Sequence, residues 1–158
     1  PVSEISERLT PALLYKTAIV TQQDLTNRFG IENPRITVCG LNPHAGEKGT
    51  LGSEDITIIK PVLSQLLSEG VNVTGPLPAD SLFHQSARSE YDCVLGMYHD
   101  QVLTPFKALF NFDAIILTLG LPFLRVSPDH GINSHMIGKN KSNPQSLISS
   151  IKFFKKIK

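Results

Sequence analysis

Blocks of apolar residues alternate with polar segments along this chain, and their spacing predicts a series of helices and strands. Apolar positions three or four residues apart indicate amphipathic helices, and short continuous apolar runs indicate buried strands. The predicted helices span residues 11–29, 53–69, 99–110 and 144–156. The predicted strands span residues 36–41, 71–73, 91–98 and 114–119. Strands and helices alternate, which is typical of an α/β fold with a mixed or mostly parallel sheet flanked by helices.

Local signals set the ends of these elements. Thr10 and Pro11 are typical of a helix start, with threonine as the cap and proline at the first helical position. Pro61 falls inside the second predicted helix, so a kink or break is expected near residues 59–60. Residues 75–80 contain two prolines and are expected to be irregular. The terminal helix is expected to bury one apolar face, formed by Leu147, Ile148, Ile151 and Phe154.

Length and composition narrow the class of protein. With 158 residues, 41% of them apolar, the chain is long enough for one domain, and we expect a single α/β unit over residues 1–158. Its net charge is +1, and no apolar run approaches the length of a membrane span, which argues against nucleic-acid and membrane partners. The basic end, with Lys152, Lys155, Lys156 and Lys158, is interpreted as a solvated helix face.

Cys39 and Cys93 each lie in an apolar run, which suits small buried thiols and a reducing, cytoplasmic setting better than a disulfide. The chain starts at Pro1 without an initiator methionine, so we expect it to be truncated.

Two histidines follow predicted strands, and both are candidates for a metal or catalytic site. His44 lies in a glycine-containing turn after the first strand, and His99 begins the helix after the third. Open α/β sheets bind ligands beyond the carboxyl ends of their strands, and a helix start favours the neutral imidazole that a metal needs. Such a site would need a third ligand. The alternative interpretation, ordinary loop histidines, has similar weight.

Other polar residues have two interpretations each. Lys107 and Arg125 lie in apolar neighbourhoods, where they could bind an anion or form structural salt bridges. The glycines at positions 46, 49 and 52 match neither the Walker spacing nor the dinucleotide fingerprint, which favours a simple turn before a helix.

Four motifs, in order, closely resemble the 4-hydroxythreonine-4-phosphate dehydrogenase family of pyridoxal phosphate biosynthesis. They are Gly40 to Glu47 (GLNPHAGE), Gly75 to Asp80 (GPLPAD), Tyr98 to Gln101 (YHDQ), and Thr118 to Phe123 (TLGLPF) with Asp129 to Gly131 (DHG). The resemblance covers nearly the whole chain, and four motifs in order are far more specific than any one.

The resemblance implies a fold similar to the isocitrate and isopropylmalate dehydrogenases, with this chain as the carboxyl-terminal half of a two-lobed enzyme. It implies a cytoplasmic homodimer with shared active sites. It also implies oxidation, with decarboxylation, of a small phosphorylated hydroxy amino acid, 4-phosphooxy-L-threonine, by NAD or NADP with a divalent metal (zinc, cobalt, manganese or magnesium). No residue is assigned to nicotinamide binding.

The family's pattern also implies roles for particular residues. His44 and His99 match two of three metal-binding histidines, and the first histidine of the family lies in a His-Leu-Pro segment of which this chain begins at the proline. Lys107 and Arg125 match substrate-binding positions, while the asparagine expected between them falls at Ile116.

Three residues are candidates for catalysis: Asp80 and Asp100 for proton transfer or ligand support, and Lys107 for oxyanion charge. For Asp100 the alternative is a helix cap. Three hypotheses follow: this dehydrogenase, a related enzyme acting on another phosphorylated hydroxy acid such as threonate 4-phosphate, or a folded but inactive fragment. The chain alone is expected to be inactive.

Overall fold

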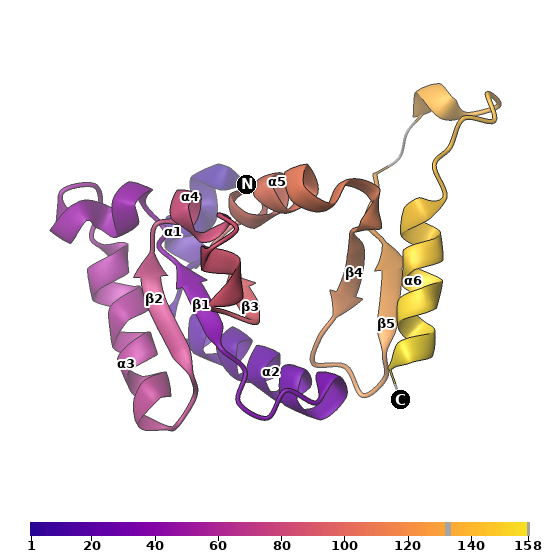
Figure 1. Ribbon diagram of the computed structural model, residues 1–158. Coiled ribbons are helices and arrows are strands. Elements are labelled where there is room, and N and C mark those ends of the chain that lie inside the picture. Colours follow the sequence, from indigo (N-terminus) through magenta and orange to yellow (C-terminus); the bar gives the residue numbers. More distant parts are fainter. Residues whose placement is uncertain (132–133, 158) are drawn as a thin grey trace. The chain divides into compact units, whose positions relative to one another are not determined.

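The computed structural model describes residues 1–131 and 134–157, and Figure 1 shows its helices and strands. The sequence predicts one unit over residues 1–158, but the contacts gather into two compact units, Pro1–Pro105 and Phe106–Lys158. Each unit has its own sheet. In the described part of the chain, no helix is both long enough and apolar enough to cross a membrane.

The first unit is built around a parallel three-stranded sheet with the order β2-β1-β3 (Figure 1). Its strands are β1 (Ile36–Cys39), β2 (Val73–Leu77) and β3 (Cys93–Leu95). Its helices are α1 (Ile5–Arg8), α2 (Pro11–Phe29), α3 (Lys60–Ser68) and α4 (Ala79–Leu82), with short turns of other helix types at Val2–Glu4, Pro43–Gly49, Asp55–Ile59 and Ala87–Ser89. The α/β fold class is confirmed, and the sheet of this unit is parallel.

β1 is the central strand, and all four of its residues are buried. This burial on both faces explains its continuous apolar sequence, because helices cover both faces of a parallel sheet. α2 starts where the sequence predicts: the Thr10 hydroxyl accepts a hydrogen bond from the Leu13 N–H at 3.2 Å, and Gly30 ends the helix with a φ of 70°. The core joins β1 to apolar side chains of α2 and α3, including Leu14, Ala18 and Leu66.

The break expected before Pro61 does not occur: a π-helical turn over Asp55–Ile59 runs directly into α3 at Lys60, so only the type of helix changes there. The expectation that residues 75–80 are irregular is wrong: β2 continues through Pro76 to Leu77, and α4 starts at Ala79. Proline is tolerated there because β2 is an edge strand, where one side of the backbone needs no ladder hydrogen bonds. β3 is shorter than the predicted strand 91–98.

The second unit contains an antiparallel pair of strands and one long helix. β4 (Ile115–Thr118) pairs with β5 (Arg125–Pro128), and α6 (Gln145–Lys156) runs beside β5 (Figure 1). The helix α5 (His99–Phe110), which matches its predicted range, crosses the boundary between the units, and short turns cover Asn111–Asp113 and Ser134–Met136.

The prediction that α6 buries its apolar face is wrong. Leu147, Ile148, Ile151 and Phe154 are between 38% and 56% exposed, while Ser146 and Ser150 are buried. Hydrogen bonding explains this orientation. The Ser146 hydroxyl donates to the Ala114 carbonyl oxygen at 2.6 Å and accepts from the Asp129 N–H at 2.8 Å, so it satisfies two backbone groups beside the strands.

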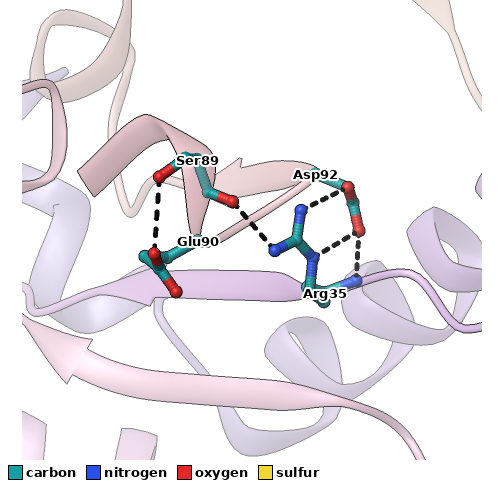
Figure 2. Close-up of polar contacts among 4 residues, drawn as sticks. All are labelled: Arg35, Ser89, Glu90 and Asp92. Atoms are coloured by element: carbon teal, nitrogen blue, oxygen red, sulfur yellow. Dashed lines mark hydrogen bonds and ion pairs between the residues drawn. The ribbon is translucent and has the colours of Figure 1, made fainter. Parts of the chain in front are cut away.

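An ion pair joins the segments that lead into β1 and β3 (Figure 2). The Arg35 Nη2 and Nε groups donate to the two carboxylate oxygens of Asp92 at 2.9 and 3.1 Å, and the Arg35 backbone N–H donates to the same carboxylate at 2.8 Å. Arg35 Nη1 donates to the Ser89 carbonyl oxygen at 2.9 Å. These bonds fix the amino ends of two neighbouring strands.

The Arg35 guanidinium lowers the pKa of the Asp92 carboxyl below its ordinary value of 3.8, mainly by hydrogen bonding. Asp92 therefore contributes stability above that value, which is lost as pH falls through its lower pKa in the folded protein. We expect Arg35→Met to reduce the free energy of unfolding at pH 7, and the difference from wild type to shrink below pH 3.8. Urea unfolding at both pH values measures this, and a difference that does not change with pH would contradict the account.

Candidate active site

A cleft of about 520 Å³ lies where the three parallel strands end. Three segments line it, and each follows the carboxyl end of one strand. The lining residues are Leu41, Asn42, Pro43 and His44 after β1, Ala79, Asp80 and Phe83 after β2, and Tyr98, Asp100, Gln101, Thr104 and Pro105 after β3. Ligand sites of open α/β sheets lie at these ends, so the cleft is the candidate site.

His44 lies in a left-handed turn. Five consecutive residues, 44–48, have positive φ angles, and only one of them is glycine; the φ of His44 is 53°. Left-handed backbone costs a residue with a side chain about 1–2 kcal/mol, so the turn persists only where its surroundings hold it. The Ala45 N–H donates to the Asn42 carbonyl oxygen at 3.1 Å, and the Leu51 N–H donates to that of Gly46 at 3.1 Å.

A buried carboxylate supports the backbone just before this turn. Asp55 is completely buried, and its two oxygens accept hydrogen bonds from the backbone N–H groups of Leu41 and Asn42 at 2.9 and 3.2 Å. The Asn42 side-chain amide donates to Asp55 at 3.0 Å and to Glu54 at 2.9 Å. At Gly40, an added Cβ would lie 2.7 Å from the Asp55 carboxylate, so the close approach requires glycine.

Gln101 connects this segment to the one that follows β3. Its side-chain Nε2 donates to the Gly40 carbonyl oxygen at 2.7 Å, and its Oε1 accepts from the Met97 N–H at 2.8 Å. Both groups of one amide side chain are therefore used between two neighbouring strand ends.

The structure brings three of the sequence-predicted site residues to the cleft: His44, Asp80 and Asp100. His99 is the first residue of α5 and is exposed, and its two neighbours, Tyr98 and Asp100, line the cleft. His99 Nδ1 lies 3.3 Å from the Asp100 carboxylate.

Imidazole and carboxylate donors suit a divalent transition metal, so the residues around the cleft fit such an ion in kind. Within residues 1–131 and 134–157, no three histidine, cysteine or acidic side chains gather closely enough to hold a metal.

The second unit carries the remaining candidates. Lys107 Nζ lies 3.2 Å from the Asp129 carboxylate, and Arg125 Nη1 donates to the Thr118 hydroxyl at 2.7 Å across the β4–β5 pair. Both basic side chains are exposed, which corrects the expectation that they lie in apolar surroundings. Ile116 on β4 is 44% exposed. These side chains are therefore accessible, and Lys107 already has an acidic partner.

The cysteines are free thiols: Cys39 is buried and Cys93 is half-buried. Burial raises the pKa of each to about 11, so neither forms a thiolate readily near neutral pH. They belong to the sheet, as the sequence predicts.

Sequence reasoning missed the roles of Asp55 and Gln101. Asp55 lies at the start of the helix predicted over residues 53–69, and its contact with residues 41–42 depends on a turn between them that local patterns do not describe. Gln101 had a usable signal, because glutamine at the third position of a helix often bonds to the backbone before it. Its second contact, to β1, has no signal in the sequence.

The fold belongs to a known class of enzymes. A crystal structure of 4-hydroxythreonine-4-phosphate dehydrogenase from Klebsiella pneumoniae is similar to the chain, with a TM-score of 0.86 and 37% identity over 97% of this chain and 46% of that one. Such enzymes share the fold of the isocitrate and isopropylmalate dehydrogenases. The chain thus has the α/β fold of this class.

Sequence comparison identifies the family within that class. The model of the family described as "Pyridoxal phosphate biosynthetic protein PdxA" matches residues 1–154. A 4-hydroxythreonine-4-phosphate dehydrogenase from Xanthobacter autotrophicus is 47% identical over 99% of this chain and 45% of its own length. Another, from Bradyrhizobium diazoefficiens, is 52% identical over 91% of this chain and 42% of its own length. The chain belongs to this family, as the motifs predict, and spans less than half the length of these relatives.

One similar structure carries another name. A terephthalate 1,2-cis-dihydrodiol dehydrogenase from Burkholderia xenovorans has a TM-score of 0.75 and 32% identity over 96% of this chain and 48% of that one. The same fold therefore serves a dehydrogenase with a different substrate.

Proposed function

We propose that this chain is part of an NAD- or NADP-dependent dehydrogenase that oxidises 4-phosphooxy-L-threonine, with decarboxylation, in pyridoxal 5′-phosphate biosynthesis. The observation that carries the proposal is the cleft at the ends of the parallel strands, where three of the family-motif residues, His44, Asp80 and Asp100, come together. Family membership supplies the reaction, and the cleft supplies a place for it in this chain.

In this proposal His44 and His99 are metal ligands, and Asp80 and Asp100 support them or transfer protons. A divalent metal there would supply Lewis-acid chemistry, lowering the pKa of a substrate hydroxyl. The contact between Asp100 and the Nδ1 of His99 supports this assignment, because a carboxylate at one imidazole nitrogen orients the other nitrogen. We propose zinc, cobalt, manganese or magnesium as the metal. The proposal assigns no residue to the binding of the nicotinamide cofactor.

In the second unit, Lys107 and Arg125 are proposed to bind anionic groups of the substrate, and Lys107 to neutralise developing negative charge. The exposed guanidinium of Arg125 is a planar fork that suits phosphate or carboxylate. Lys107 would first have to leave or share the Asp129 carboxylate.

We also propose that the protein is a cytoplasmic homodimer with shared active sites, and that this chain is the carboxyl-terminal half of a two-lobed subunit. The exposed apolar residues of α6 support an additional protein surface there, since large apolar patches mark interfaces. The two free thiols are consistent with a reducing compartment.

The second candidate is a related dehydrogenase acting on another phosphorylated hydroxy acid such as threonate 4-phosphate. Two observations favour keeping it: Ile116 is exposed on β4 where the family pattern has an asparagine, and the fold also occurs in a dihydrodiol dehydrogenase. Isoleucine cannot hydrogen-bond to a substrate, so specificity could differ at this position. The third candidate is a folded fragment without activity.

Reduction of NAD or NADP by the full-length protein, with each substrate and a divalent metal, tests the first two candidates. We expect 4-phosphooxy-L-threonine to be oxidised, and Ile116→Asn to raise kcat/KM for it, by about tenfold if one hydrogen bond to a charged group is gained. Preference for threonate 4-phosphate, with a loss of activity in Ile116→Asn, would instead support the second candidate. The same assay of the 158-residue chain by itself tests the third candidate, which would be supported by no reduction with any substrate and no binding of the metal in equilibrium dialysis.

A further inference from the structure

The side chain of Gln101 forms a direct connection between two walls of the cleft. One wall is the turn after β1, which carries His44, and the other is the segment of residues 96–101, which carries His99. The Gln101 amide donates to the Gly40 carbonyl oxygen at 2.7 Å and accepts from the Met97 N–H at 2.8 Å. Both contacts have the length of strong hydrogen bonds, and the one to Gly40 joins residues 61 positions apart.

Helix capping explains only one of the two contacts. A glutamine near the third position of a helix commonly accepts a hydrogen bond from the backbone before the helix, as Gln101 does from Met97. A glutamate would serve this purpose equally well, and its charge would be favourable at a helix start. The donor half of the amide, which contacts Gly40, is not needed for the cap.

The contact to Gly40 acts on a segment that is held on its other side by Asp55. The Gln101 amide donates a hydrogen bond to the carbonyl oxygen of residue 40, and the Asp55 carboxylate accepts hydrogen bonds from the N–H groups of residues 41 and 42. The strained left-handed turn with His44 follows at once. Gln101 and Asp55 thus hold residues 40–42, and the position of these residues determines where the His44 turn begins.

We propose that Gln101 is a positioning residue that holds the His44 turn against the His99 segment and so sets the spacing of the two imidazoles. The inference rests on the proposed function, because it assigns the purpose of that spacing to the binding of a divalent metal. Gln101 itself is not a ligand in this proposal; it acts through Gly40 and Met97.

Gln101→Glu in the full-length protein tests the proposal, because it keeps the acceptor for Met97 and replaces the donor to Gly40 by an oxygen that repels the carbonyl. We expect the melting temperature to stay close to that of wild type, since the cap is kept. Amide hydrogen exchange over residues 40–45 should become faster without metal. Co²⁺ affinity, from visible absorption, should fall about tenfold or more, as when groups that orient metal ligands are changed.

Gln23→Glu is the matched control, because it makes the same change of charge at an exposed position of α2. It should match wild type in all three measurements. Unchanged exchange and unchanged Co²⁺ affinity in Gln101→Glu would overturn the inference, as would a large loss of melting temperature, which would show a merely structural role. If wild type itself does not bind Co²⁺, the metal assignment of the proposed function fails, and the exchange measurement still decides whether Gln101 holds the turn.

Discussion

Replacing Asp55 by alanine is expected to lower the free energy of unfolding by about 3–5 kcal/mol, among the largest effects of any single substitution in the first unit. The carboxylate is completely buried and accepts three hydrogen bonds from Leu41 and Asn42. Alanine removes the acceptor of the two backbone N–H groups and leaves the Asn42 amide with only its contact to Glu54. The left-handed turn at residues 44–48 then loses its support. Urea unfolding of the full-length variant measures the effect.

Asp80→Ala is the matched control for this substitution. Asp80 lines the cleft and is exposed, so its removal should change stability by less than about 0.5 kcal/mol. Asp55→Asn separates charge from shape, since its amide nitrogen would face other donors. We expect it to be destabilising as well. Equal stability of the Asp55→Ala and Asp80→Ala proteins would show that Asp55 does not hold the turn.

Replacing His44 by alanine is expected to reduce the affinity of the full-length protein for Zn²⁺ or Co²⁺ at least about tenfold. Even the loss of a group that only hydrogen-bonds to a metal ligand lowers metal affinity by about 10- to 100-fold. Its position supports this expectation. His44 lines the cleft at the end of β1 and is exposed, so its removal leaves no buried cavity and should not unfold the protein. Equilibrium dialysis of the metal against each variant gives the affinity, and His99→Ala should have a similar effect.

His84→Ala is the control for both histidine variants. His84 is also exposed, follows α4, and is not among the residues that line the cleft. Its replacement should leave metal affinity unchanged. If His44→Ala and His99→Ala retain wild-type affinity, the two histidines are not ligands, and the metal is bound elsewhere or not at all.

Much of the first unit could be predicted because its signals are local. The Thr10 cap and the start of α5 at His99 each depend on residues a few positions apart. The errors have non-local causes. Pro76 continues a strand because β2 is at the edge of the sheet. The order of the strands along the chain does not show which strand is at the edge, because it differs from their order in the sheet. The apolar face of α6 is exposed because Ser146 bonds to backbone groups beside two strands.

The candidate site has the same division. Family motifs and strand ends pointed to His44, Asp80 and Asp100, since the carboxyl ends of parallel strands meet at one edge. Asp55 and Gln101 were missed as supports of that edge. Their partners, at residues 40–42, lie 13 to 61 positions away, and the contacts exist only after the strands have assembled.

The sequence by itself determines the α/β class, the family and the residue types available for chemistry. Periodicity, helix caps and motifs depend only on residues that are close together in the chain. The folded chain adds which side chains are buried, which strand lies at the edge, and how the His44 turn is held. These three features depend on contacts between segments that are far apart in the chain, because such segments share hydrogen bonds and pack into the same buried volume. The completely buried Asp55 shows the difference: in sequence it is one acid among several, and in the structure it holds the end of β1.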